Sequence, residues 1–432
     1  MNSITKPVPQ GTERSVRISP VRFRVVAFMM ALGGVTYLDR VCIGILAPDI
    51  MRDLSIDTIQ MSYVFSAFTF AYALFELPTA WWADRIGSRK VLTRIVVWWS
   101  AFTMLTGAAF SYPVMLATRA LFGVGEAGAW PNVGRIYSRW IPAEERGRVQ
   151  GIFFAGAHLA GGLTPAVVAW IALMLPWRWV FVLFGFVGLA WAASFYRWFR
   201  DEPREHPSIT VAERDWIEAK RGGEGGHAPG GWRAVFGAPG LIPLCVQYFA
   251  NTYGFYFFIT WLPEYLRNAR GMQSAELAIF AGLPLTLSAV ADISGGVTTD
   301  FLAKKLGVRA GYRLVGGVAY VLAAIIMAAG AASSNGRMAG VLIAIAGALS
   351  MFTLAPSWAT AITLGGESAG LMGAVMNTAG QVGGILSPIV LAQLVKHYGD
   401  WSLPLYVLAG LYAMAAACWL FIRPDKRGYA KN

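Results

Sequence analysis

Long apolar stretches alternate with short polar segments along the whole chain. Most are longer than the ~20 residues that a helix needs to cross the hydrocarbon core of a bilayer. The pattern predicts spanning helices at twelve positions, namely 22–46, 59–83, 90–110, 113–138, 147–172, 178–199, 238–264, 276–302, 311–332, 337–363, 369–395 and 402–423. The sequence therefore predicts an all-α membrane protein with twelve transmembrane helices in two bundles of six.

Polar segments set the predicted boundaries of the two bundles. In chain order we expect an N-terminal tail, a first bundle, a linker, a second bundle and a C-terminal tail at 1–20, 21–199, 200–236, 237–423 and 424–432. The linker is charged at first and then Gly-rich. Within it, Thr210 and Glu213 form a capping-box pattern, which predicts a short polar helix that ends near Lys220.

The distribution of basic residues predicts the orientation. Of the 36 Lys and Arg residues, 28 lie in the tails, the linker and the connections on the same side, whereas 6 lie on the opposite side. Basic residues are enriched in cytoplasmic loops, so we expect a multi-pass protein of the cell membrane with both termini cytoplasmic. The net charge of +12 is then a topology signal, and no nucleic-acid partner is expected.

Two sequence landmarks recur in the two halves. The second predicted helix ends with ADRIGSRK and the eighth with TTDFLAKK, while GGLTP in the fifth helix matches GGILSP in the eleventh. Chance recurrence of short motifs is the alternative, but ordered matches favour a pseudo-symmetric transporter with its site between the halves. We expect four charged residues of the two connecting segments to act in gating: Asp84, Arg85, Arg89 and Asp300.

Four ionisable residues lie deep inside the first and fourth predicted spans. Asp39 and Arg40 lie in the first span, and Arg119 and Glu126 lie in the fourth, two helical turns apart on the same stripe. Each costs about 2.5 to 3.5 kcal/mol to insert unpaired, so mutual pairing across the two spans is the least costly arrangement. One interpretation is a pair of salt bridges that only hold the helices together. The other is a cavity that binds an anion and exchanges protons.

The second interpretation has a specific chemistry. Arginine keeps its charge and presents a planar fork to a carboxylate. When a substrate carboxylate binds Arg40 or Arg119, the displaced Asp39 or Glu126 becomes easier to protonate. Anion binding and proton uptake are coupled in this way.

Other polar residues in the spans are open to two interpretations each. Glu76 is either a third proton site or a hydrogen-bonded residue between helices. Asp292 is expected in a charge network on the cytoplasmic side, and His158 as a hydrogen-bonded packing residue, although it can titrate. The second half offers polar and aromatic groups that suit a sugar-like substrate, or that anchor the helices at the interface: Gln247, Tyr248, Asn251, Tyr253, Tyr256, Thr260, Trp261, Ser357, Trp358, Asn377 and Gln381.

No residue pattern indicates a cofactor, a metal or a catalytic centre. GVGEAG, residues 123–128, matches a dinucleotide fingerprint, but it lies within a spanning helix where small residues allow close packing. The 3 cysteines and 4 histidines lack the spacing of metal ligands. A membrane-embedded enzyme would need a nucleophile, or a histidine with an acid at fixed spacing, so we expect no enzyme and only the proton as coupling ion.

The motifs together resemble a known family. ADRIGSRK is similar to the loop signature of the major facilitator superfamily, although Ala80 stands where the pattern usually has Gly. YLDR in the first span, RALFGVGEAGAWP in the fourth and TWLPEYL in the seventh resemble its anion:cation symporter branch. That branch includes bacterial hexuronate, glucarate and galactonate transporters, and the resemblance covers all twelve spans.

The resemblance implies roles for individual residues. Asp39 and Glu126 match the protonation sites of the branch, Arg40 its ligand for the substrate carboxylate, and Arg119 the arginine that pairs with these carboxylates. Further positions match residues that line the sugar-acid site: Tyr37, Tyr72, Ser357, Trp358 and Asn377. Ala157 stands where several sugar-acid carriers have glutamine, and the seventh span lacks the basic residue of some other anion carriers.

The resemblance also implies the activity. We expect a carrier, active as a monomer in the lipid bilayer, that imports a small organic anion with protons by rocker-switch alternating access. A sugar acid, such as a hexuronate, aldonate or aldarate, is the expected substrate. The alternatives are a carrier or exchanger of another organic acid, for example an aromatic carboxylate, and a sensor that binds without transport.

Overall fold

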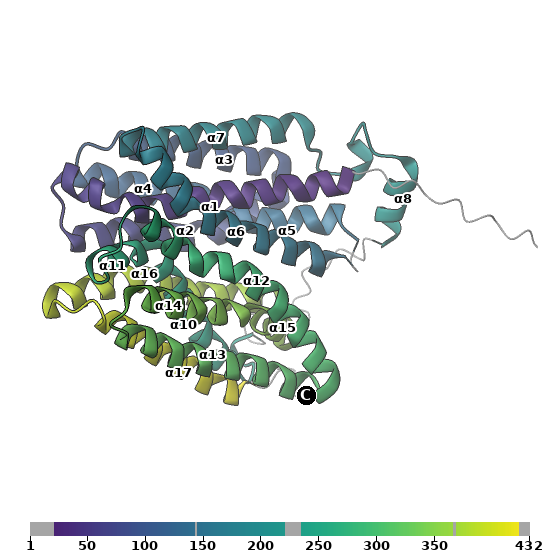
Figure 1. Ribbon diagram of the computed structural model, residues 1–432. Coiled ribbons are helices and arrows are strands. Elements are labelled where there is room, and N and C mark those ends of the chain that lie inside the picture. The colour runs from purple at the N-terminus through teal and green to yellow at the C-terminus, as the bar shows by residue number, and fades with distance from the viewer. Residues whose placement is uncertain (1–20, 143–144, 221–234, 366–368, 423–432) are drawn as a thin grey trace, which may run out of the picture.

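A computed structural model of the chain describes residues 21–142, 145–220, 235–365 and 369–422. The described residues form helices and contain no strand, as the sequence predicts. The two expected tails and residues 221–234 of the expected linker lie outside these ranges. Figure 1 shows the helices running roughly parallel, with the N-terminal group above the C-terminal group.

The N-terminal bundle supplies the first six crossings. Its helices are α1 (Val21–Leu54), α2 (Thr58–Ile86), α3 (Ser88–Gly107), α4 (Tyr112–Glu126), α5 (Ala129–Trp140), α6 (Arg146–Ala172) and α7 (Trp177–Trp198). Helices α4 and α5 form one crossing that is broken at Ala127 and Gly128. Helix α1 continues beyond the predicted end at residue 46, because its last turns are polar and extend past the apolar stretch.

Part of the expected linker folds against the start of α1. It contains a short 3-10 helix, η1 (Pro203–Glu205), and α8 (Val211–Lys220). The Glu213 backbone N–H donates to Thr210 Oγ1 at 3.3 Å, so the predicted capping residue is in place. The Arg22 guanidinium lies 4.3 Å from the ring centre of Trp216, which holds α8 at this end of the bundle.

The C-terminal bundle supplies the other six crossings. Its helices are α10 (Leu241–Thr260), α11 (Leu262–Asn268), α12 (Ser274–Leu306), α13 (Val308–Ala332), α14 (Gly336–Phe352), α15 (Leu354–Gly365), α16 (Ala369–Tyr398) and α17 (Leu403–Phe421). Two crossings are interrupted, α10 from α11 at Trp261 and α14 from α15 at Thr353. Nine spans in the described ranges are long and apolar enough to cross a membrane by length and composition alone. The remaining crossings are shorter, broken or more polar.

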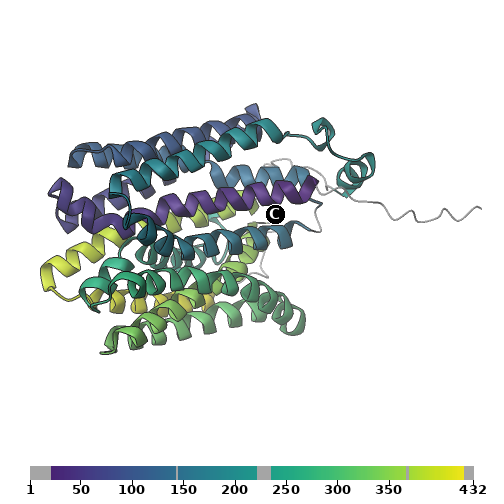
Figure 2. The same cartoon turned by 45° about the horizontal axis from the view of Figure 1, so that its top comes forward.

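The two bundles meet along two seams, α6 against α12 and α2 against α16. At the end where α1 finishes, Lys396 Nζ lies 3.2 Å from Asp57 Oδ2, and the rings of Phe65 and Trp261 are 5.2 Å apart. A Cβ on Gly282 would meet the backbone of Gly162 across the α6–α12 seam. These contacts close the end of the molecule opposite α8, at the left in Figures 1 and 2.

Candidate functional site

An arginine and a glutamate form a hydrogen-bonded pair between α1 and α4. Arg40 Nε donates to Glu126 Oε1 at 2.5 Å, and the two side chains are 7% and 0% exposed. Arg40 Nη2 and Glu126 Oε2 have no hydrogen-bond partner among the described residues. The pair therefore has one free donor and one free acceptor.

Asp39 and Arg119 lie beside this pair without joining it. Both are buried, and Asp39 lies within electrostatic range of Glu126 and Arg119. In the described part of the chain, no hydrogen bond of good geometry reaches Nε or Nη1 of Arg119 or the carboxylate oxygens of Asp39, although the Thr103 side chain lies beside Asp39. The structure thus brings the four predicted charges together, but it hydrogen-bonds only one of the two expected pairs.

Small residues place Glu126 at this depth. Helix α4 ends at Glu126, and the Ala127 N–H donates to Gly123 O at 3.1 Å. A Cβ on Gly123 would meet the Phe68 backbone, and one on Gly125 would meet Trp98. GVGEAG therefore serves close packing of α4 against α2 and α3, as the sequence context indicates.

Aromatic rings surround the Arg40 guanidinium. Its carbon lies 5.0 Å from the ring centre of Tyr72, 5.2 Å from that of Phe68 and 6.0 Å from that of Trp130. Tyr37 packs edge-on against Trp130 at 6.4 Å. Such rings stabilise a cation and exclude water, so Arg40 is held in an aromatic cage.

The C-terminal bundle contributes two aromatic residues of α10 to the same place. Phe255 packs edge-on against Tyr37 with ring centres 6.1 Å apart, and Tyr256 lies within electrostatic range of Arg40 and Glu126. Sequence reasoning included Tyr256 only in a general set of polar residues and missed Phe255. From sequence alone, an aromatic residue that lines a binding site cannot be distinguished from one that anchors a helix at the membrane interface.

A hydrogen-bonded bridge crosses the α2–α16 seam next to the site. Asn377 Nδ2 donates to both carboxylate oxygens of Glu76, at 3.0 and 2.9 Å. Glu76 also lies within electrostatic range of Tyr72 and Tyr248. Of the two interpretations of Glu76, the structure displays the hydrogen bond to a neighbouring helix.

A second bridge crosses the α6–α12 seam. His158 Nδ1 lies 2.5 Å from Asp292 Oδ2, and the imidazole packs edge-on against Tyr37 with ring centres 5.4 Å apart. The expectation that Asp292 belongs to a charge network on the cytoplasmic side is wrong, because its partner is this buried histidine beside the site. An acidic residue inside an apolar span was the signal that could have identified it.

Ser357 and Trp358 of α15 make their described contacts within the C-terminal bundle. Ser357 Oγ donates to Thr353 O at 2.7 Å and contacts Gln247 Oε1 at 3.3 Å, so its described hydrogen bonds remain within that bundle. Trp358 packs edge-on against Tyr248 at 6.1 Å. Tyr248 in turn lies within electrostatic range of Glu76.

Of the four residues expected in gating, two have described side chains, and the described contacts of these two are with residues outside this cluster. The side chains of Asp84 and Arg85 lie outside the described part of the structure. Arg89 donates from Nε and Nη2 to Tyr196 O at 2.9 and 2.6 Å, which joins α3 to α7 within one bundle. Asp300 is exposed near the end of α12, within electrostatic range of Tyr312.

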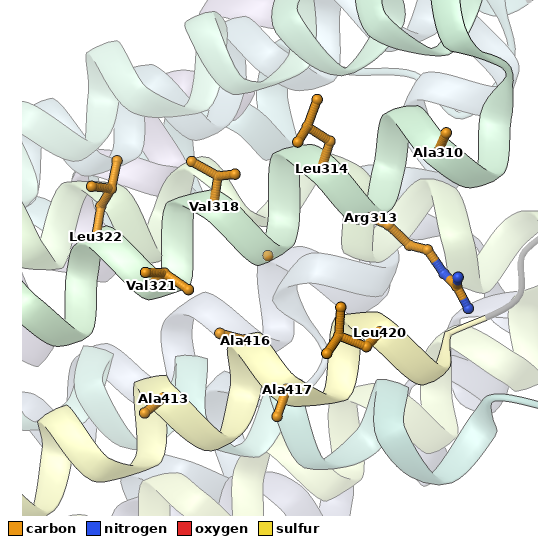
Figure 3. A pocket seen from close by; sticks show the side chains of 11 residues that line it. Ala310, Arg313, Leu314, Val318, Val321, Leu322, Ala413, Ala416, Ala417 and Leu420 are labelled. Carbon is orange, nitrogen blue, oxygen red and sulfur yellow. The ribbon is translucent and has the colours of Figure 1, made fainter.

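A groove of 610 Å³ lies between α13 and α17 (Figure 3), and none of the residues that line it belongs to the candidate site. Exposed apolar side chains line it, including Leu314, Val318 and Leu420. In a membrane protein such a surface faces the acyl chains of lipids. The groove is therefore part of the lipid-facing surface and not of the candidate site.

Comparisons with known sequences agree with this architecture. The family model described as Major Facilitator Superfamily matches residues 29–388. The chain is 34% identical to the probable sulfoacetate transporter SauU of Cupriavidus necator, over 93% of this chain and 94% of the relative. It is 29% identical to the probable galactarate/D-glucarate transporter GudP of Bacillus subtilis, over 98% and 96%. It is 27% identical to the hexuronate transporter of the same organism, over 93% and 94%.

A comparison with solved structures concerns the fold. The chain is similar to a bacterial homolog of the human lysosomal transporter Spinster, crystallised in an inward-facing and unoccupied conformation, with a TM-score of 0.70. The alignment covers 94% of this chain and 95% of the other, at 20% sequence identity. At this identity the likeness concerns the arrangement of helices alone.

Proposed function

Because the chain belongs to the Major Facilitator Superfamily and is similar to transporters of sugar acids, we propose that it imports a small organic anion of this class by proton symport. The chain is a multi-pass membrane protein of a transporter family. In this proposal Asp39 and Glu126 are the proton-coupling residues, and Arg40 and Arg119 bind the anionic group.

The observation that carries the proposal is the hydrogen bond from Arg40 Nε to Glu126 Oε1. Arg40 Nη2 is free to donate to one oxygen of a substrate carboxylate, and a side-on bidentate contact would use Nε as well. A substrate that takes both nitrogens displaces Glu126. The displaced carboxylate is then buried without a partner, which favours its protonation.

Charge balance supports coupling to protons. Arg40, Arg119, Asp39 and Glu126 carry two positive and two negative charges when all are ionised. An added monoanion would leave a net negative charge in a buried, low-dielectric site, which is costly. A proton that enters with the anion restores neutrality.

The surrounding residues suit the rest of a sugar acid. Tyr37, Tyr72 and Tyr256 offer hydroxyl groups and ring faces, and Asn377 offers an amide from the opposite bundle. Polar groups of this type hydrogen-bond substrate hydroxyls, while aromatic faces contact the carbon skeleton. In this proposal Ser357 and Trp358 of α15 also line the substrate path from the side of the C-terminal bundle.

Transport by alternating access requires the bundles to rock about this site. The contacts of Asp57 with Lys396 and of Phe65 with Trp261 close one end. We infer that this is the extracellular end, that both termini are cytoplasmic, and that the carrier works as a monomer in the plasma membrane. The basic residues of the tails and connections support this orientation.

A sulfonated short acid is the second candidate substrate. The 34% identity to a probable sulfoacetate transporter favours it, and Arg119 offers a second cationic group near Arg40. An aromatic carboxylate is a third possibility within the same mechanism.

Uptake into proteoliposomes tests the proposal. Purified protein is given D-glucarate, D-galactonate, D-glucuronate, sulfoacetate and benzoate in turn, with and without an inward proton gradient. We expect gradient-driven accumulation of at least one sugar acid. Accumulation of sulfoacetate alone would select the second candidate. Flux that ignores the proton gradient would identify an exchanger, and binding without flux would identify a sensor; either result would contradict symport.

A further inference from the structure

A buried histidine and aspartate face each other across the seam between the bundles. His158 of α6 and Asp292 of α12 approach to 2.5 Å, and their side chains are 4% and 7% exposed. Asp292 Oδ1 is buried and has no hydrogen-bond partner among the described residues. The contact joins residues 134 positions apart in the sequence, so it exists only while the two bundles are in contact at this depth.

The described residues whose rings contact His158 are aromatic and carry no positive charge. Tyr37 of α1 packs against the imidazole at 5.4 Å, and Phe255 of α10 packs against it at 6.3 Å. Tyr37 is within electrostatic range of Asp292 and separately of Arg40, Glu126 and Tyr256. Among the described residues, Asp292 pairs with His158, and no lysine or arginine forms an ion pair or hydrogen bond with it. Arg40, which is within electrostatic range of Tyr37, is already bonded to Glu126.

This environment determines how many protons the pair holds. A buried carboxylate beside a neutral imidazole would leave one uncompensated negative charge inside the membrane, which is strongly unfavourable. One added proton, on the imidazole or shared with the carboxylate, makes the pair neutral overall. The closed seam therefore favours the protonated pair.

Opening the seam reverses this preference. When α6 and α12 separate at this depth, the imidazole and the carboxylate are each exposed to water and no longer stabilise each other. An imidazole in water exchanges its proton near neutral pH, and an isolated carboxylate needs no proton there. The proton is therefore bound on closing and released on opening.

We propose that His158 and Asp292 form a second proton-binding site that adds one proton to each transport cycle. This inference depends on the proposed symport and concerns a site distinct from Asp39 and Glu126. It predicts that more than one proton accompanies each substrate anion. The first site responds to the bound anion, whereas the second responds to the relative position of the bundles.

The test is the proton-to-substrate ratio in proteoliposomes. D-Galactonate, which carries one negative charge, serves as the probe, and the ratio is calculated from the pH gradient or membrane potential that balances a fixed probe gradient. We expect His158→Gln and Asp292→Asn each to lower the ratio by one relative to wild type. Both variants should bind the probe within about threefold of wild type by thermal shift, because neither residue holds the anion.

Two further variants make the result decisive. The exchanged pair His158→Asp with Asp292→His should recover the wild-type ratio, because it restores an imidazole–carboxylate contact across the seam. Thr286→Val, on α12 against Gly162 of α6, removes a hydroxyl that does not titrate in this pH range and should keep the wild-type ratio.

The outcomes separate this inference from the proposed function. An unchanged ratio in His158→Gln and Asp292→Asn would overturn it, and so would loss of probe binding in both, which would place the pair in the anion site. If the wild-type protein itself shows no proton-driven accumulation, the symport proposal has failed. That result is obtained without any variant.

Discussion

Asn377 on α16 donates from one amide nitrogen to both carboxylate oxygens of Glu76 on α2, at 3.0 and 2.9 Å. The contact joins the two bundles directly beside the candidate site. An amide is a donor at any pH, and a carboxyl group can accept from it whether or not that group is ionised.

Asn377→Asp should make substrate binding depend on pH. The change places two carboxylates in contact, and both cannot be ionised there without repulsion. We expect weakened binding of D-glucarate or sulfoacetate at neutral pH and recovery at mildly acidic pH, where one shared proton restores the hydrogen bond. Binding is measured by thermal shift over a pH series. Asn377→Gln keeps a neutral donor and serves as the control. Identical pH profiles for the two variants would contradict this role of the bridge.

Arg40→Lys should weaken substrate binding by roughly tenfold or more, because an ammonium cannot present two parallel N–H donors to a carboxylate. The aromatic cage of Tyr72, Phe68 and Trp130 is shaped for a planar cation and adds to the loss. The measurement is counterflow of the transported probe. Arg337→Lys, in an exposed pair with Glu276, should leave counterflow unchanged. Normal transport by Arg40→Lys would place the anion elsewhere.

Glu126→Gln should separate exchange from accumulation. The amide oxygen can still accept from Arg40 Nε, but the side chain no longer gains or loses a proton. We expect loss of proton-driven accumulation with substrate exchange partly retained. Parallel uptake and exchange assays in the same vesicles measure this. The exposed variant Glu276→Gln is the control, and accumulation that persists in Glu126→Gln would exclude Glu126 as the coupling residue.

Gly282→Ala should hinder closure of the α6–α12 seam. A Cβ at this position meets the Gly162 carbonyl, and backbone cannot move aside as a side chain can. We expect a loss of about 1 to 3 kcal/mol in the closed arrangement and slower transport with probe binding retained. Gly296→Ala, on the same helix with open space around its Cα, is the matched control. Equal transport rates for the two variants would show that this contact does not limit the cycle.

The ion pair of Asp57 and Lys396 predicts a small pH effect at the closed end. Hydrogen bonding to the Gln60 backbone N–H, together with Lys396, lowers the pKa of Asp57. Its stabilising contribution is therefore complete above the ordinary pKa of aspartate and is lost as pH falls through the lowered value. Asp57→Ala should cost about 1 kcal/mol through the lost cap of α2. Lys396→Met should cost less, because both partners are exposed. Thermal unfolding at neutral pH measures both, and a larger effect of Lys396→Met would contradict this order.

The sequence contains enough information to place the crossings, because each is specified locally by its own apolar length. The predicted span at 113–138 corresponds to α4 and α5, although the break at Ala127 and Gly128 depends on packing against α2 and α3. Hydropathy alone does not indicate such a break, because alanine and glycine have the same hydropathy whether the helix is continuous or broken.

The candidate site was predictable only in part. Charges inside apolar spans identify Asp39, Arg40, Arg119 and Glu126, but not which carboxylate Arg40 contacts, because both lie within reach of its long side chain. The contact of His158 with Asp292 depends on how two bundles meet, and no local pattern encodes that meeting.

The four buried charges of the candidate site, Asp39, Arg40, Arg119 and Glu126, all belong to the N-terminal bundle. The C-terminal bundle contributes tyrosine, phenylalanine and asparagine beside them. Substrate preference can therefore change through substitutions on α10, α15 and α16 that leave the energy-coupling groups untouched. Relatives that carry different acids could thus have diverged mostly in one half of the molecule.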